Sequence, residues 1–206
     1  ISEVVPAKWT LASSTCTGQQ NPSSVQVGPG QNVVCTFTNR APLPTIEVSK
    51  NALSATVAEP SGSVTFQVTV TNTSVEPVTI TEIKDSIEGG PALDLTTTGG
   101  PITATTCGAL DNKVLTASGP GASATCTFTA TVSGNNGDVI DDVVTVDAYD
   151  SSQNKATDSD DASVTVTAEA PTISVTKTPS VSSIAEPGGT VSYTVKITNN
   201  GSEAVT

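Results

Sequence analysis

Apolar and polar residues alternate along most of this chain. In the clearest stretch, Val64, Phe66, Val68 and Val70 are separated by threonine and glutamine. A period of two predicts a strand with one face on a core and the other in solvent. Similar short runs occur at 45–50, 54–58, 78–84, 102–106, 124–132, 142–149 and 162–168, with Gly-, Pro- and Asn-rich turns between them. No stretch shows a helical period, so the pattern predicts an all-β fold of tandem immunoglobulin-like β-sandwiches.

A repeat divides the chain. Residues 44–79 and 171–206 align without a gap at an offset of 127, with 16 identities in 36 positions that include Lys50 with Lys177 and Asn72 with Asn199. A fixed period of this kind indicates an array of modules. We therefore expect a complete sandwich at 43–170, followed at 171–206 by the first strands of a second copy. We expect residues 1–42 to form the C-terminal part of a different β domain, and the whole sequence to be a window on a longer polypeptide.

Composition narrows the classes of function. The net charge of −12 disfavours nucleic acid and anionic membrane surfaces, which require a basic footprint. No apolar run approaches the roughly 20 residues that span a bilayer. The chain contains no histidine, and no nucleophile stands beside a base in a recognisable motif. We therefore expect that it is not an enzyme.

The four cysteines form two pairs with the same spacing, Cys16 with Cys35 and Cys107 with Cys126. The second member of each pair lies within a similar string, GPGQNVVCTFT at 28–38 and GPGASATCTFT at 119–129. Zinc is the rival interpretation, but the chain has neither a CxxC motif nor histidine. The pattern predicts two intradomain disulfides, and hence an oxidising, extracellular or cell-surface compartment.

Several of these motifs are shared with known families. Residues 44–206 resemble the conserved Ig-like repeat of large bacterial extracellular proteins, through Val48 and Lys50, the Glu-Pro-Ser-Gly run at 59–62, the strand ending at Asn72, and Asp85. Residues 1–42 resemble the end of a prealbumin-like (CnaB-type) domain, through the E-x-x-P-x-x-W opening and the CTFTN ending. These resemblances imply stalks, adhesins and fimbrial backbones.

An acidic stretch is a candidate calcium site. Residues 150–161 are expected to bend between two strands and to bring Asp150, Asp158 and Asp160 together. Ca²⁺ takes six to eight oxygen ligands, which such a loop could supply. The alternative is a solvated hairpin whose acids keep strand edges from pairing with other chains.

An internal isopeptide bond is the other candidate. In the resembling Ig-like domains that form such bonds, a lysine on the first strand joins an asparagine on a late strand beside a carboxyl group. Lys50 and Asp85 match the lysine and acid positions, whereas the late position reads Asp141-Asp142. In the N-terminal piece, Glu3 and Asn39 match the acid and the acceptor of the prealbumin-like pattern. The alternative for the lysine is an ordinary salt bridge or a side chain that reaches the surface.

Two functions are consistent with these observations. The first is a structural segment of a secreted bacterial surface protein, acting as a stalk, fimbrial backbone or extracellular filament. The second is an adhesin module that binds a surface ligand through a calcium-loaded acidic loop. The expected partners are neighbouring repeats of the same polypeptide, or further copies joined by strand complementation into a homopolymer.

Overall fold

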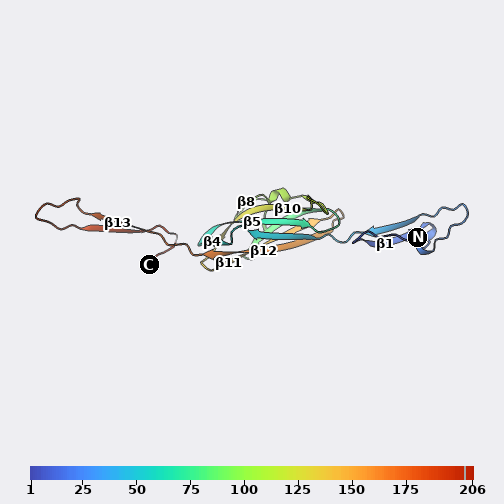
Figure 1. The fold of residues 1–206 in the computed structure, drawn as a ribbon, viewed down its shortest axis with the longest axis horizontal. Coiled ribbons are helices and arrows are strands. Elements are labelled where there is room, and N and C mark those ends of the chain that lie inside the picture. Colours follow the sequence, from blue (N-terminus) through green and yellow to red (C-terminus); the bar gives the residue numbers. More distant parts are fainter. Residues whose placement is uncertain (202) are drawn as a thin grey trace.

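The computed structural model describes residues 1–201 and 203–206. It has a central β-sandwich, with a two-stranded hairpin toward each end of the elongated molecule (Figure 1). Short 3-10 turns at Thr17–Gln19, Pro22–Ser24 and Cys107–Leu110 are the helical segments within the described residues. The predicted all-β fold is confirmed.

Two sheets form the central sandwich. One has the strand order β3 (Ile46–Ala52), β5 (Ser61–Asn72), β10 (Ser123–Ser133) and β8 (Ile102–Thr105). The other has the order β4 (Thr56–Ala58), β12 (Lys155–Thr167), β11 (Val139–Tyr149), β6 (Val78–Ile87) and β7 (Leu93–Asp94), with β9 (Val114–Leu115) also paired to β6. Neighbouring strands are antiparallel except β4 and β12, which are parallel.

The core is built from small side chains on alternating positions. Val64, Phe66, Val68 and Val70 of β5 are each at most 1% exposed, while the residues between them are partly exposed. The facing sheet contributes Ile80, Ile83, Val144 and Val146. The two phenylalanines at the centre, Phe66 and Phe128, are paired across β5 and β10, and their rings are stacked at 5.2 Å. The β-branched composition therefore fills a pleated interior, as expected.

The end of the sandwich differs from the sequence prediction. The sequence predicts that residues 150–161 bend between two strands, but the turn occupies only the first part of this segment, and β12 already begins at Lys155. Along β12, Ala156, Val164 and Val166 are buried, and every residue from Lys155 to Thr165 is paired with β11. The first half of this strand was not predicted because aspartates occupy alternate positions at which a strand with one buried face ordinarily has apolar residues.

The two end hairpins are separate two-stranded sheets. The first pairs β1 (Thr10–Cys16) with β2 (Cys35–Arg40), and the second pairs β13 (Ile173–Pro179) with β14 (Tyr193–Asn199). In the second hairpin Ile173 faces Asn199, the same register in which Ile46 faces Asn72 in the sandwich. The structure thus repeats the local pairing that the 127-residue offset predicts.

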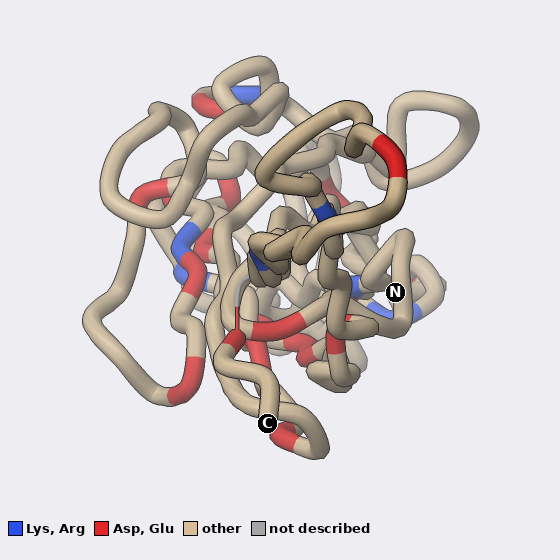
Figure 2. The backbone as a smooth tube through the Cα atoms, turned by 90° about the vertical axis from the view of Figure 1, so that its left-hand side faces the viewer, with Lys and Arg blue, Asp and Glu red and all other residues tan. Residues whose placement is uncertain are grey.

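Both predicted disulfides are present. Cys16–Cys35 joins directly paired residues of β1 and β2, and Cys107–Cys126 ties the third 3-10 turn to β10. Acidic residues are spread around the molecule and outnumber the basic ones (Figure 2). No helix among the described residues is long and apolar enough to cross a membrane.

Candidate functional site

A lysine and two aspartates meet inside the sandwich. Lys50 lies on β3, Asp85 on β6 and Asp142 on β11, and all three side chains are 0% exposed. Lys50 Nζ donates a hydrogen bond to Asp85 Oδ1 at 2.6 Å and lies 2.6 Å from Asp142 Oδ1. We call these three residues the buried triad. The structure therefore brings together the three residues that the sequence selected for an internal bond in this domain.

Strand register explains how the two carboxyl groups come together. Asp85 is paired with Val144, and Asp142 is two residues before Val144 on the same strand. Residues two apart on a strand share a face, so the aspartates are diagonal neighbours on the inner face of one sheet. Lys50 reaches them from the opposite sheet, and the triad spans the interior.

Aromatic rings form the wall around the lysine. Lys50 Nζ lies 4.7 Å from the ring centroid of Phe66 and 5.1 Å from that of Phe128. Ring faces attract a cation, and the same rings keep water away from it. Sequence reasoning assigned these phenylalanines only to the core. The signal for Phe66 was its place on β5, the strand next to β3, whereas Phe128 lies one strand further on, on β10, and reaches the lysine because it is paired with Phe66.

The charges of the triad are not balanced. One ammonium faces two carboxyl groups, and burial raises the pKa of Asp85 to about 7, with a further increase from the neighbouring Asp142 carboxyl group. The Lys50 ammonium opposes this rise. Asp85 therefore holds a proton up to near-neutral pH, which brings the site closer to neutrality. Asp85 Oδ2 and both oxygens of Asp142 are buried without a hydrogen bond of good geometry.

Such an arrangement has the parts needed to form an amide. It holds an amine, a carboxyl group in contact with it and a second carboxyl group with a raised pKa, in a site without exposed atoms. A proton-exchanging acid whose pKa lies near the working pH is the most effective one. The geometry divides the roles, since Asp85 accepts the hydrogen bond from Nζ while Asp142 contacts the nitrogen without one.

The predicted calcium site is corrected by the structure. Asp150 caps a turn, accepting hydrogen bonds from the backbone amides of Ser152 and Asn154 and from the Asn154 side chain. These bonds, that of the Asn154 side chain foremost, lower the pKa of Asp150. Asp158 and Asp160 lie on β12 and point to a different strand. Within residues 1–201 and 203–206, no group of three or more acidic or cysteine side chains is arranged to hold a metal.

Instead, Asp158 and Asp160 close an open edge. β3 is the outer strand of its sheet, so one row of its amides has no strand partner. Asp158 Oδ2 accepts from the Val48 amide, and Asp160 Oδ2 accepts from the Lys50 amide, each at 2.7 Å. This matches the alternative interpretation, in which the acids protect a strand edge. They also fix the backbone of the triad lysine.

In the N-terminal piece, Glu3 and Asn39 are also adjacent. The Asn39 side-chain amide donates to Glu3 Oε1 at 2.6 Å. Glu3 Oε2 and Asn39 Oδ1 are buried without a hydrogen-bond partner. No lysine in the described part of the chain forms an ion pair with Glu3.

Glu59 is a buried polar residue whose role sequence reasoning missed. Its carboxylate accepts from the backbone amides of Asn136, at 2.6 Å, and Glu169, at 3.3 Å. It thereby ties the start of β5 to a turn and to the segment that leaves the domain. The signal was its recurrence as Glu186 in the second copy.

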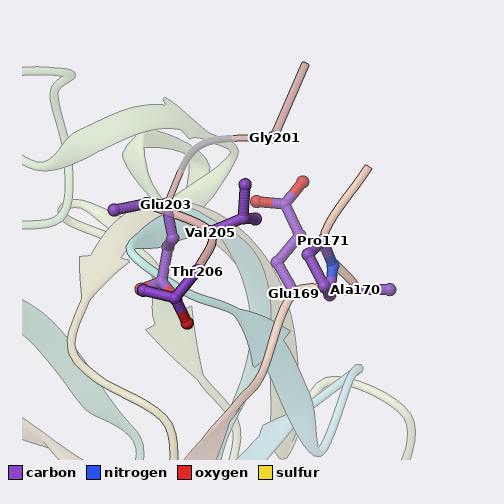
Figure 3. A pocket seen from close by; sticks show the side chains of 8 residues that line it. Glu169, Ala170, Pro171, Gly201, Glu203, Val205 and Thr206 are labelled. Carbon is purple, nitrogen blue, oxygen red and sulfur yellow. The ribbon is translucent and has the colours of Figure 1, made fainter. Parts of the chain in front are cut away.

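A surface hollow lies elsewhere. A space of about 280 Å³ is lined by the interdomain segment at Glu169, Ala170 and Pro171 and by residues near the end of the chain (Figure 3). It contains none of the triad residues, so the chemistry of the triad belongs to the interior of the sandwich.

These features define an all-β protein whose central part is an immunoglobulin-like sandwich with a buried ionic triad. No family model matches the chain, and no curated protein matches it. Solved structures similar to it include the CARDB domain of a Pyrococcus furiosus protein in complex with di-metal ions, at 17% identity and a TM-score of 0.34, covering 62% of this chain and 96% of that domain. A PapD-like domain of human CEP192 is 12% identical with a TM-score of 0.36, covering 73% of this chain and 99% of that domain. At these TM-scores the two likenesses carry no argument about this chain.

Proposed function

We propose that this chain is a structural, non-catalytic segment of a secreted bacterial surface protein, in which the central sandwich is a spacer cross-linked by an amide between Lys50 and Asp142. The observation that carries the proposal is the contact of Lys50 Nζ with Asp142 in a fully buried site beside Asp85. The two disulfides support an extracellular location, since such bonds persist in oxidising compartments.

The bond-forming step is a condensation. The ammonium of Lys50 passes one proton to the Asp142 carboxylate, the neutral amine attacks Cγ of Asp142, and the nitrogen–carbon bond replaces one carbon–oxygen bond. Protonated Asp85 gives its proton to the departing hydroxyl, which leaves as water, and then takes one proton from the nitrogen, so that Asp85 ends the reaction protonated as it began. No oxidant or reductant is needed, and the phenylalanine rings exclude the water that would reverse the step.

Intact mass tests the cross-link. After reduction of the disulfides, the chain should weigh less than its sequence by one water, and a digest should contain a branched peptide joining Lys50 to Asp142. Lys50→Met should have the full mass, and Asp85→Ala should slow or abolish the bond. In Asp142→Asn the same attack would release ammonia rather than water, so the mass lost would change accordingly. A wild-type chain of full mass would refute the covalent part of the proposal.

Force spectroscopy tests the spacer function. Tension enters the sandwich before β3 and leaves after β12, so the bond would carry it past residues 51–141. With Cys107–Cys126 closed, the unlinked domain should lengthen by roughly 370 Å of contour and the linked domain by roughly 130 Å. Lys50→Met is the matched control and should give the long event. Equal lengthening of the two chains would contradict the load-bearing role of the bond.

A second bond is proposed at the N-terminal hairpin. Glu3 and Asn39 provide an acid and an amide acceptor with unpaired buried oxygens, and a lysine from another strand would complete the set. The partners we propose are neighbouring repeats, or copies joined by strand complementation. Adhesion through a calcium loop is not favoured by any specific contact, because the three candidate aspartates are engaged elsewhere.

A further inference from the structure

One face of the β13–β14 hairpin is apolar and uncovered. The five large apolar side chains on this face are between 54% and 67% exposed: Ile173, Val175, Tyr193, Val195 and Ile197. A contiguous apolar face of this kind on a polar protein marks a surface that another element covers. Lys177 lies on the same face as these residues.

This hairpin reproduces the lysine-bearing half of the triad. Lys177 is paired with Val195 as Lys50 is paired with Val68, so the two hairpins share one register. Lys177 Nζ lies 4.3 Å from the ring centroid of Tyr193, and Lys50 Nζ lies 4.7 Å from that of Phe66 at the equivalent position. The cation and its aromatic wall are therefore preformed before anything covers them.

The sandwich shows what covers such a face. In the first copy, the β3–β5 face is covered by the sheet containing β6 and β11, which presents Asp85 and Asp142 to the lysine. A buried lysine without an anionic partner would be strongly unfavourable. A second copy of this hairpin, laid face to face, would oppose two lysines and is disfavoured for that reason.

We infer that the β13–β14 face docks a β-sheet of the same repeat type, whose inner face is apolar and presents two carboxylates to Lys177. The complementarity is that of the first copy, with apolar side chains around one cation and two acids. The inference rests on the repeated register and on the contacts of Lys177, and it holds whether or not the lysine goes on to form an amide.

An extended chain tests the inference. Because the repeat aligns without a gap, a second copy of residues 80–170 can be joined directly after Thr206. Lysine side chains are then acetylated with a limiting amount of an amine-reactive reagent. Peptide mass spectrometry compares the extent of acetylation of Lys177 with that of Lys196 in the same hairpin. Lys196 lies on the opposite face and is the internal control.

In the chain without the extension, the two lysines should react at comparable rates, since both are exposed. In the extended chain, Lys177 should react at least tenfold more slowly while Lys196 is unchanged. Equal reactivity of Lys177 with and without the extension would overturn the docking.

Replacing the appended copies of Asp85 and Asp142 by asparagine tests the two carboxylates. The thermal midpoint of the extended chain should fall and Lys177 should regain reactivity. If that variant fails to fold, adding Lys177→Met should restore hydrogen-exchange protection at Tyr193, because the unpaired cation is then removed. Undiminished protection in the asparagine variant, or no rescue by Lys177→Met, would overturn the carboxylate requirement.

Discussion

Removing the triad cation should make the stability of the sandwich depend steeply on pH. Lys50→Met leaves Asp85 and Asp142 buried against each other without a counter-charge. The matched reference is Lys50→Met with Asp85→Asn and Asp142→Asn, which has the same lysine replacement and no carboxyl groups. Neither variant can form the proposed amide, so the comparison isolates the electrostatics of the site.

The magnitude follows from the proton that the site retains. The pKa of Asp85 is already raised to about 7 with Lys50 present, and the lysine lowers it, so its loss raises the pKa further. The native state then binds a proton that the unfolded chain releases above pH 4, and stability falls by about 1.4 kcal/mol per pH unit as the pH rises. Between pH 4 and 7 this gives about 4 kcal/mol, within the range found when a buried ion pair loses one partner.

Urea unfolding followed by far-ultraviolet circular dichroism from pH 4 to 8, with the disulfides oxidised, measures the difference. Lys50→Met should be the less stable variant at pH 7, and the gap should narrow toward pH 4, where the unfolded chain begins to bind the proton that Asp85 already holds in the native state. The general acidity of the chain affects both variants equally. A gap below about 1 kcal/mol at pH 7, or one that does not change with pH, would mean that water reaches the aspartates.

Three further perturbations probe the frame of the site. The double variant Asp158→Ala with Asp160→Ala should lower the free energy of unfolding by about 1–3 kcal/mol per unpaired amide, measured by urea unfolding. It should also self-associate through the exposed edge of β3, measured by light scattering, and a variant that stays monomeric with unchanged stability would refute the edge-protection role. Cys107→Ser with Cys126→Ser should lower the stability of the sandwich by about 3 kcal/mol, whereas Cys16→Ser with Cys35→Ser should leave it unchanged. Glu59→Gln should speed hydrogen exchange at Asn136 and Glu169, and equal exchange rates would show that the carboxylate does not hold these amides.

Much of the fold was predictable because the strands alternate regularly. The run from Val64 to Val70 has one apolar face, and its burial follows the pattern residue by residue. The disulfides were predictable because both pairs have the same spacing and similar neighbouring sequence. These features depend on local sequence, which a single chain displays directly.

The acidic strand was not predictable in this way. Asp158 and Asp160 occupy the alternate positions of β12 that elsewhere on the strand hold buried apolar residues. Their side chains face the edge of β3 rather than the core, and they accept hydrogen bonds from backbone amides 110 residues away in the sequence. Because the partner of each carboxylate is a backbone amide, the type of residue at the partner position does not reveal the hydrogen bond. Local sequence therefore cannot distinguish this role from a solvated loop or a metal site.

The composition of the triad favours the interpretation that these residues react to form an amide over the interpretation that they stabilise the domain as an ion pair. The core contains few large side chains, so a lysine and two aspartates occupy volume that apolar residues would use better. Replacement of a buried ion pair by apolar residues of similar size is often neutral or stabilising by about 1–4 kcal/mol. An unlinked triad would thus be a cost to the domain, whereas an amide would remove the cation and one carboxylate together and leave Asp85 as the remaining acid. The recurrence of the lysine in the second copy, in the same register and against the same kind of ring, fits a site retained for that reaction.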